Sequence, residues 1–310
     1  MIQQLKKHYS NLLKLKRRLL YGRPIIVMLY HRINDYTGQN LSYLTVSNSN
    51  FEQQLQFFAS KYQILKINED RSKLKKNGVV ITFDDGYADN LINALPLLEK
   101  YNIPATVFVT TLNIGTNNEF WWDRLSFDYT MLPETFWLPE NNQSVSKLDW
   151  SNYKISEELK KKKSNPEKVK WLEEFEAINN IKFEPRPEYR SLSIEELIQL
   201  SNHPLITIGV HTENHYSLGK LTFEEQKIEI ETNINKLKEL GVSDCKYIAF
   251  PHGSYNSDTF RVMELLDVKV GFLANNNFAD KYQWKLKKVS RIIAHNYSVN
   301  KMEQFLKLLR

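Results

Sequence analysis

Histidines and aspartates stand just after several apolar segments of this 310-residue chain. The residues and the segments before them are His31 after Ile25–Tyr30, Asp84-Asp85-Gly86 after Val79–Phe83, His211 after Leu205–Val210, and His252 after Tyr247–Phe250. If the segments are parallel strands of one closed sheet, their carboxyl ends converge on one face, where active sites are built. Structural histidines scattered through a core would not follow strand ends in this way.

The pair Asp84-Asp85 places two carboxylates at one strand end, and Gly86 permits a tight turn after them. Adjacent strand residues point to opposite faces, but both can reach one cavity where the strand breaks. One carboxylate can then bind a cation while the other handles protons, as hydrolysis at a metal requires. Asp-Asp-Gly is also a common turn sequence, so this motif alone does not establish a site.

The segment His211-Thr-Glu-Asn-His215 spaces two imidazoles by one helical turn, which predicts that both face one ion. Two histidines and one carboxylate form a frequent catalytic metal set, which leaves positions open for water and substrate. Two surface histidines can have the same spacing. The buried strand before His211 and the distant Asp84-Asp85 pair favour the metal site.

The apolar segments alternate with amphipathic helices, which predicts an α/β fold with a parallel sheet buried on both faces. The expected elements, besides the strands above, are strands over Ala105–Val109 and Val268–Phe272, helices over Asn50–Lys61 and Asn90–Lys100, and a helix after the capping box Ser193-Ile-Glu-Glu196. Their number favours a closed or nearly closed barrel over an open sheet. We therefore expect a single barrel domain over residues 25–310.

Residues 132–190 interrupt this alternation and predict an insertion that forms a lid or rim. The stretch is polar, contains several prolines and includes the run Lys160–Lys163. A lysine run of this kind is typical of a solvated helix face, which is the interpretation adopted for it.

The charge of the chain is concentrated at its beginning. The net charge is +6, and residues 1–24 hold seven Lys and Arg without any Asp or Glu. Helical spacing of Ile2, Leu5 and Tyr9 predicts a basic amphipathic helix over residues 1–24, which either caps the domain or lies on an anionic membrane surface. No segment has the length of a membrane span. Cys245 is the only cysteine, so we expect a cytoplasmic protein, with peripheral membrane association as an option.

Three motifs together resemble those of the polysaccharide deacetylase family, carbohydrate esterase family 4. They are Ile81-Thr-Phe-Asp-Asp-Gly86, His211-Thr-Glu-Asn-His215 and Phe250-Pro-His-Gly253. The resemblance implies a distorted (β/α)7 barrel that hydrolyses acetyl groups from N-acetylated sugars with a divalent ion. Zinc is the expected ion, with Co²⁺, Ni²⁺, Mn²⁺ and Fe²⁺ as alternatives.

The resemblance also implies roles for individual residues. Asp85, His211 and His215 would hold the ion, and Asp84 would be the general base. The segment Pro251-His252-Gly253 with Tyr255 would supply oxyanion and substrate contacts. Phe120-Trp-Trp-Asp123 resembles the Trp-Asp segment of a permuted branch that contains poly-N-acetylglucosamine deacetylases. Trp121 and Trp122 would wall the acetyl pocket or belong to the core.

Two roles depart from the usual family pattern. The general acid of most relatives is a late-strand histidine, which here would be His295. Val27-Met-Leu-Tyr-His31 instead resembles the permuted branch, where the first strand supplies the acid, and we favour His31. The arginine that often orients the base is replaced by Ala249, and Arg291 is a candidate substitute.

The expected function is metal-dependent removal of an N-acetyl group from an amino sugar during surface-glycan or lipid-linked glycan synthesis. The alternatives are a deformylase or another amidase acting on a related sugar, and a catalytically inactive glycan-binding module. The retained base and metal residues argue against the binding module, because binding alone needs no base. Basic and aromatic residues do not interleave as in a nucleic-acid platform, so no nucleic-acid partner is expected.

Overall fold

The computed structural model describes residues 23–35, 43–71, 74–140, 143–162, 164–242 and 244–309. The predicted N-terminal helix over residues 1–24 lies outside these ranges, except for its last two residues. No helix among the described ranges is long and apolar enough to cross a membrane.

One sheet of parallel strands forms the centre of the molecule. Its strands are β1 (Ile25–Tyr30), β4 (Gln63–Ile64), β5 (Gly78–Phe83), β6 (Ala105–Val109), β9 (Ile206–Val210), β10 (Tyr247–Ala249), β11 (Val270–Phe272), β12 (Lys288–Val289) and β13 (Ile292–Ile293). The six strands expected from the sequence are present, with their ends shifted by at most two residues.

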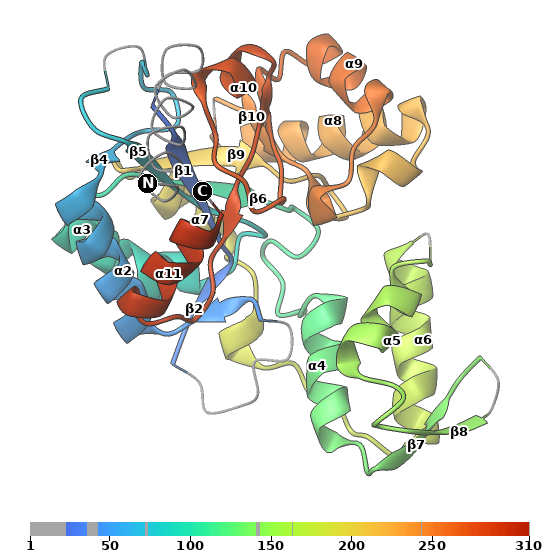
Figure 1. Cartoon of the computed structure of the whole chain (residues 1–310). Helices are drawn as coiled ribbons and strands as arrows, with labels where there is room; N and C mark the ends of the chain where they lie inside the picture. The colour runs from blue at the N-terminus through green and yellow to red at the C-terminus, as the bar shows by residue number, and fades with distance from the viewer. Residues whose placement is uncertain are drawn as a thin grey trace, which may run out of the picture.

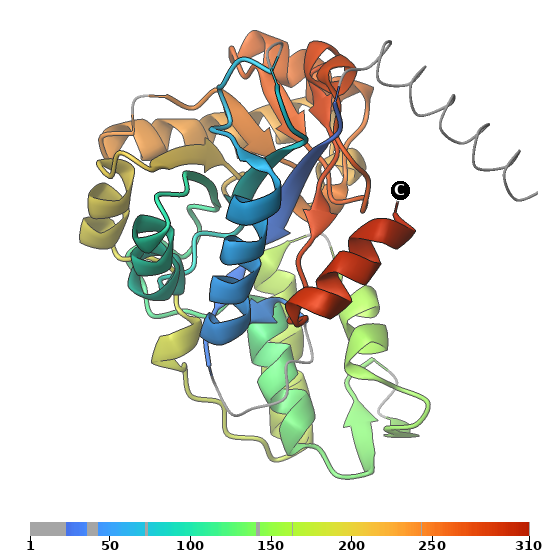
Figure 2. The same cartoon turned by 60° about the vertical axis from the view of Figure 1, so that its left-hand side comes forward.

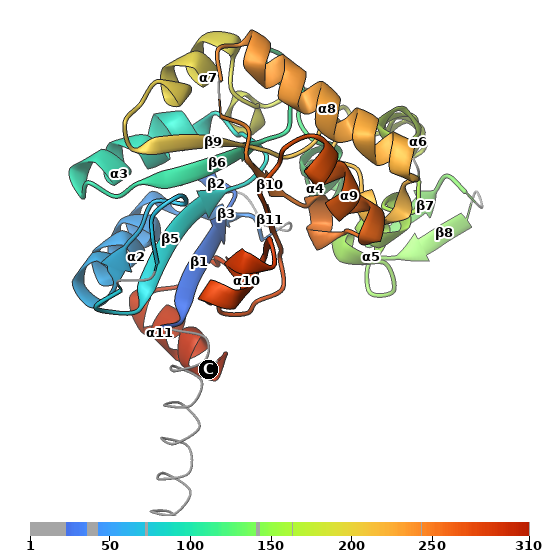
Figure 3. The ribbon, with the colours of Figure 1, turned by 90° about the horizontal axis from the view of Figure 1, so that it is seen from above.

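The strand order is β12-β11-β10-β9-β6-β5-β1-β13, and β4 pairs with β5 outside this path. The two end strands, β12 and β13, are consecutive in the chain, so the polypeptide itself crosses between the two ends of the curled sheet. Figure 3 shows the curvature, with helices on the outer side. The predicted α/β fold with a curled parallel sheet is confirmed.

Helices cover the outer face of this sheet (Figures 1 and 3). They are α2 (Asn48–Lys61), α3 (Leu95–Lys100), α7 (Ile194–Ser201), α8 (Phe223–Glu239), α9 (Ser257–Leu265) and α11 (Val299–Leu308). The short helix α10 (Lys281–Lys285) instead packs Trp284 against the cluster that contains Val27 and Phe108. Figure 2 shows α11 beside α2, where Lys61 and Glu303 form an ion pair. The predicted capping box at Ser193 and Glu196 is confirmed at the start of α7.

The helix predicted over Asn90–Lys100 begins as a wider turn. Residues Asn90–Ala94 form the π-helical segment η1, in which the N–H of Leu95 donates to the carbonyl of Asn90. Pro96 follows at the start of α3 and has no N–H to donate to the preceding turn. Pro96 thus lies at the point where the helix changes from the π to the α type.

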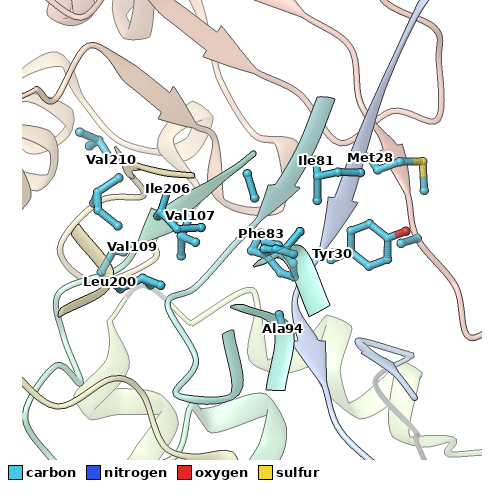
Figure 4. Close-up of a cluster of buried hydrophobic side chains, with 14 of the residues drawn as sticks. Met28, Tyr30, Ile81, Phe83, Ala94, Val107, Val109, Leu200, Ile206 and Val210 are labelled. Carbon is cyan, nitrogen blue, oxygen red and sulfur yellow. The ribbon is translucent and has the colours of Figure 1, made fainter. Parts of the chain in front are cut away.

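Alternate strand residues form two hydrophobic layers. The outward layer includes Met28, Ile81 and Val107, which pack against helices such as α3 and α7 (Figure 4). The inward layer includes Val27 and Phe108, which fill the barrel. Because strand side chains alternate between the two faces, this parity also fixes the direction of the residue that follows each strand.

A smaller unit stands beside the barrel and has its own hydrophobic cluster. It consists of α4 (Trp121–Met131), the hairpin β7 (Thr135–Leu138) and β8 (Gln143–Ser146), α5 (Asn152–Leu159) and α6 (Asn165–Ile178). Figure 1 shows it at the lower right of the barrel. These elements overlap the stretch 132–190, and α4 precedes that stretch.

Candidate active site

Asp84 and Asp85 follow β5, and the backbone turns both carboxylates into one space. Val80 and Thr82 are inward residues of β5, so strand alternation sends Asp84 inward as well. Asp85 would point outward, but it has a φ of 75°, and Gly86 follows with 80°. Such left-handed backbone is uncommon for a residue with a side chain. Both carboxylates are buried, at 3% and 1% exposure.

His211 and His215 reach the same space from the end of β9. Alternation points His211 inward, and its Nδ1 lies 2.9 Å from the carbonyl oxygen of Ala249. This contact fixes the ring and leaves Nε2 facing the carboxylates. The predicted helical turn between the two histidines is wrong. The segment is an irregular loop with positive φ at Thr212 and His215, and this backbone brings the rings together.

Asp85, His211 and His215 each offer one ligand atom, and the three atoms lie within 4.8 Å of one another. Oδ1 of Asp85 is 3.4 Å from Nε2 of His211 and 3.3 Å from Nε2 of His215. This oxygen is buried and accepts no hydrogen bond from the described residues. A buried carboxylate oxygen in that state is suited to bind a cation. The donor set therefore fits a divalent ion such as zinc, with positions left open.

Arg291 forms a bidentate ion pair with Asp84. Its two terminal nitrogens lie 2.6 and 2.7 Å from the two carboxylate oxygens, and both side chains are buried. Arg291 stands between β12 and β13, in the segment that crosses between the sheet ends. Burial alone would raise the pKa of Asp84, but the charges of Arg291 and His211 hold it below its ordinary value. Asp84 is thus kept ionised.

His31 and His295 have different surroundings. His31 follows β1, close enough for the charges of Asp85 and Asp84 to act on it, although burial still lowers the pKa of its imidazole. His295 stacks on Tyr297 at 4.9 Å and meets the edge of Phe305 at 5.5 Å. Of the two candidates for the acid, only His31 lies near the carboxylate pair.

The segment after β10 lies beside His215. Pro251–Gly253 form the short turn η4, in which the N–H groups of Gly253 and Ser254 bond back to Phe250 and Pro251. His252 has a φ of 56°, and its ring centre lies 4.6 Å from that of His215. Tyr255 packs on Phe250 at 5.4 Å, inside an aromatic group of the barrel wall.

Trp122 forms a wall of the site, and Trp121 supports it. The ring of Trp122 lies 4.7 Å from that of His215 and stacks on Phe120 at 4.5 Å. Trp121 meets Trp122 edge to face at 5.4 Å. Both tryptophans also belong to the hydrophobic cluster of the smaller unit. The two tryptophans therefore line the site and also belong to the hydrophobic core of the smaller unit.

A buried polar network, which the sequence did not indicate, holds Trp122. Tyr87 accepts a hydrogen bond from Nε1 of Trp122 at 2.9 Å and donates one to Asp123 at 2.6 Å. Arg32 of β2 (Arg32–Ile33) lies 3.3 Å from the other Asp123 oxygen and under the ring of Tyr189. Tyr87 follows the Asp-Asp-Gly motif and Arg32 follows His31. Adjacency to those motifs was the only available signal.

Comparisons with known proteins agree with this geometry. The profile of the family described as polysaccharide deacetylase matches residues 71–271. A poly-β-1,6-N-acetyl-D-glucosamine N-deacetylase of Staphylococcus epidermidis is 31% identical over 121 residues, which cover 33% of this chain and 42% of that relative. The chain thus spans less than half of that relative's length.

Two solved structures share the fold. The Streptococcus pyogenes deacetylase PplD, in complex with acetate, superposes with a TM-score of 0.60 at 20% identity, covering 91% of this chain and 97% of that one. The structure of IcaB from Ammonifex degensii gives a TM-score of 0.60 at 16% identity, with 93% and 97% covered. At these identities the likeness concerns the fold alone.

Proposed function

This chain belongs to the polysaccharide deacetylase family, and on that premise we propose that it is a metal-dependent hydrolase that removes the N-acetyl group from an amino sugar. One observation carries the proposal. Asp85, His211 and His215 present three ligand atoms to one point, while the adjacent Asp84 is ion-paired with Arg291. A glycan-binding module would have no need of the second, ionised carboxylate.

Asp84 is the proposed general base. A divalent ion at this site supplies Lewis acidity, which makes water more acidic and polarises an amide carbonyl. Asp84 accepts the proton of the attacking water, since its carboxylate is ionised and lies 3.8 Å from Nε2 of His211. Arg291 orients Asp84 through both of its oxygens, which restricts the geometry of proton transfer.

His31 is the proposed general acid, and the N–H of His252 the proposed oxyanion donor. An amine leaves an acetyl group only when it is protonated, and His31 is the histidine outside the ligand set on which both carboxylate charges act. The neighbouring N–H groups of Gly253 and Ser254 are already bonded within the η4 turn. Trp122 would bound the space for the acetyl methyl group beside His215.

The biological setting is part of the proposal. The substrate would be an N-acetylated sugar in surface-glycan or lipid-linked glycan synthesis, the ion zinc, and the site of action the cytoplasm or its membrane face. Flotation with anionic vesicles tests the membrane association, by comparing the full chain with residues 25–310. Equal flotation of the two proteins would contradict a role for residues 1–24.

Acetate release from N-acetylglucosamine oligomers by the zinc-loaded protein tests the function. We expect release that stops on chelation and returns with zinc, and that is absent from His211→Ala together with the bound ion. Formylated oligomers, assayed in parallel, test the deformylase alternative. Faster formate than acetate release would replace the deacetylase by that alternative, and metal-independent release would contradict the proposed mechanism.

A further inference from the structure

The smaller unit is fastened to the loop that carries His215. Asn165, the first residue of α6, donates from Nδ2 to the carbonyl of Asn214 at 2.8 Å. Its backbone N–H donates to the hydroxyl of Tyr216 at 3.1 Å. The first turn of α6 is therefore bonded to both chain neighbours of a proposed metal ligand, which places α6 at the edge of the active site.

Lys168 in this first turn has an unusual environment. The residue is buried at 4% exposure, and among the described residues its ammonium group contacts two aromatic rings and forms no ion pair. Its Nζ lies 5.2 Å from the ring centre of Trp121 and 5.5 Å from that of Tyr216. Aromatic faces attract a cation, but they do not neutralise it.

Further positive charge surrounds Lys168. Burial, followed by the charge of Lys220, lowers the pKa of its ammonium group to about 8, and Glu167 opposes this shift only in part. Lys220 donates to the carbonyl of Lys160 at 3.4 Å, at the end of α5 (Figure 1). A cation in the first turn of a helix is also opposed by the helix dipole. Burial, the neighbouring lysine and the helix dipole therefore all disfavour the positive charge of Lys168.

Other lysines of the smaller unit are neutralised by carboxylates. Lys160 pairs with Glu157 at 2.7 Å, Lys161 with Glu158 at 2.6 Å, Lys162 with Glu140 at 3.5 Å, and Lys170 with Glu174 at 3.9 Å. Lys170 lies only two residues from Lys168 on the same helix, yet it is exposed. The lysine run interpreted as a solvated face is therefore paired at Lys160, Lys161 and Lys162, whereas Lys168 is buried.

The position of Lys168 connects it with the proposed chemistry. Trp121, under its ammonium group, packs against Trp122, which contacts His215. The positive charges of Lys160 and Lys168 also reach His252. An anion held by Lys168 would therefore lie next to a sugar whose acetyl group is in the active site.

We propose that Lys168, with Lys220 beside it, binds a phosphate group of the substrate. The inference rests on the proposed function and narrows its substrate to an amino sugar that carries phosphate. Two ammonium groups and a helix N-terminus close together suit a group with two charges and several oxygens better than a single carboxylate. The phosphate can come from a glycosyl phosphate, a nucleotide or a phosphodiester within a glycan.

Calorimetric titration of the zinc-loaded full chain tests the proposal through the affinity for each probe. The probes are N-acetylglucosamine, N-acetylglucosamine 1-phosphate, its uridine diphosphate conjugate and N-acetylmuramic acid. The variants are Lys168→Met, which keeps the unbranched chain, Lys168→Arg, which keeps the charge, and Lys170→Met as the matched control. Thermal unfolding of each variant verifies that it is folded.

We expect the wild type, Lys168→Arg and Lys170→Met to bind one or both phosphorylated probes more tightly than N-acetylglucosamine. Lys168→Met should lose about 10- to 100-fold of that affinity, because a charge-assisted contact is removed. The probe that loses affinity identifies a monoester or a diester as the phosphate source.

Unchanged phosphate binding in Lys168→Met, or an equal loss for the neutral sugar, would overturn the phosphate site. An equal loss for N-acetylmuramic acid would overturn the choice of phosphate over carboxylate. If the protein binds phosphate through Lys168 but releases acetate from none of the probes, the proposed function is refuted. The anion site itself would then still be supported.

Discussion

Two groups of buried carboxylates lie close to the active site, and their surroundings move the pKa values in opposite directions. Asp84 and Asp85 face an arginine and imidazoles, which hold both pKa values below the ordinary range against the effect of burial. Asp89 and Asp123 lie near the guanidinium group of Arg32, but burial outweighs its charge and raises their pKa values to about 7 and about 6.

The difference shows how one protein maintains ionised and neutral carboxyl groups at similar depth. Burial penalises charge at both places, so the balance depends on how many compensating groups meet each carboxylate. Arg291 forms an ion pair with Asp84, and the imidazoles of His211 and His215 lie 3.4 and 3.3 Å from Asp85. The second group supports the wall of the site through Tyr87 and Trp122. Proton chemistry is thus expected from the first group and rigidity from the second.

The largest effect is expected from Asp84→Asn. The variant keeps the ligand set but has no base, so acetate release should fall by about 10²–10⁴-fold, while the zinc content by atomic emission stays unchanged. Asp123→Asn is the counterpart from the second group and should lose much less activity. Similar losses in the two variants would remove the functional distinction between the groups.

Arg291→Met should cost about 3–5 kcal/mol of unfolding free energy, because it leaves Asp84 buried without its partner. It should also raise the pKa of Asp84. Activity requires the ionised base, so the acid limb of the pH–rate profile of kcat/KM should move to higher pH. Arg291→Lys keeps the charge and should restore much of the profile. An acid limb that stays in place in Arg291→Met would show that Arg291 does not tune the base.

Tyr87→Phe tests the second group at its contact with the site. The change leaves Nε1 of Trp122 without its acceptor, which should cost about 1–3 kcal/mol of stability. We expect KM to rise more than kcat falls, since the wall moves while the base and ligands remain. Tyr153→Phe, at an exposed position, is the control for urea unfolding and kinetics. A fall in kcat alone would indicate a direct catalytic role for Tyr87.

The last expected effect concerns the pH dependence of stability. Asp89 has a folded pKa of about 7 against an ordinary value of 3.8, so the folded state binds a proton that the unfolded state has lost between these values. The stability from this proton is present below pH 3.8 and is lost as the pH rises through 7. Asp89→Asn should therefore flatten the fall in unfolding free energy over this range, measured with urea. A slope as steep as that of the wild type and of exposed Asp244→Asn would contradict the shift.

The sequence by itself determined the fold class and the assembly of the central residues. Apolar strands placed His31, Asp84 and His211 immediately after buried segments, and parallel pairing in one sheet must bring such ends together. The side that each residue faces also follows from strand parity, because alternation along a strand is a local property of the backbone. Motif spacing added His215, although the expected helical turn was wrong.

Only the tertiary structure decided which residues from distant segments meet this centre. Arg291 reaches Asp84 because the chain crosses between the two ends of the curled sheet. His295 comes after this crossing and packs on Tyr297, away from the carboxylate pair. Lys168 and Lys170 look alike in the sequence, yet one is buried without a carboxylate and the other is exposed and paired. Burial and charge compensation depend on the groups that packing brings together, and sequence spacing does not contain that information.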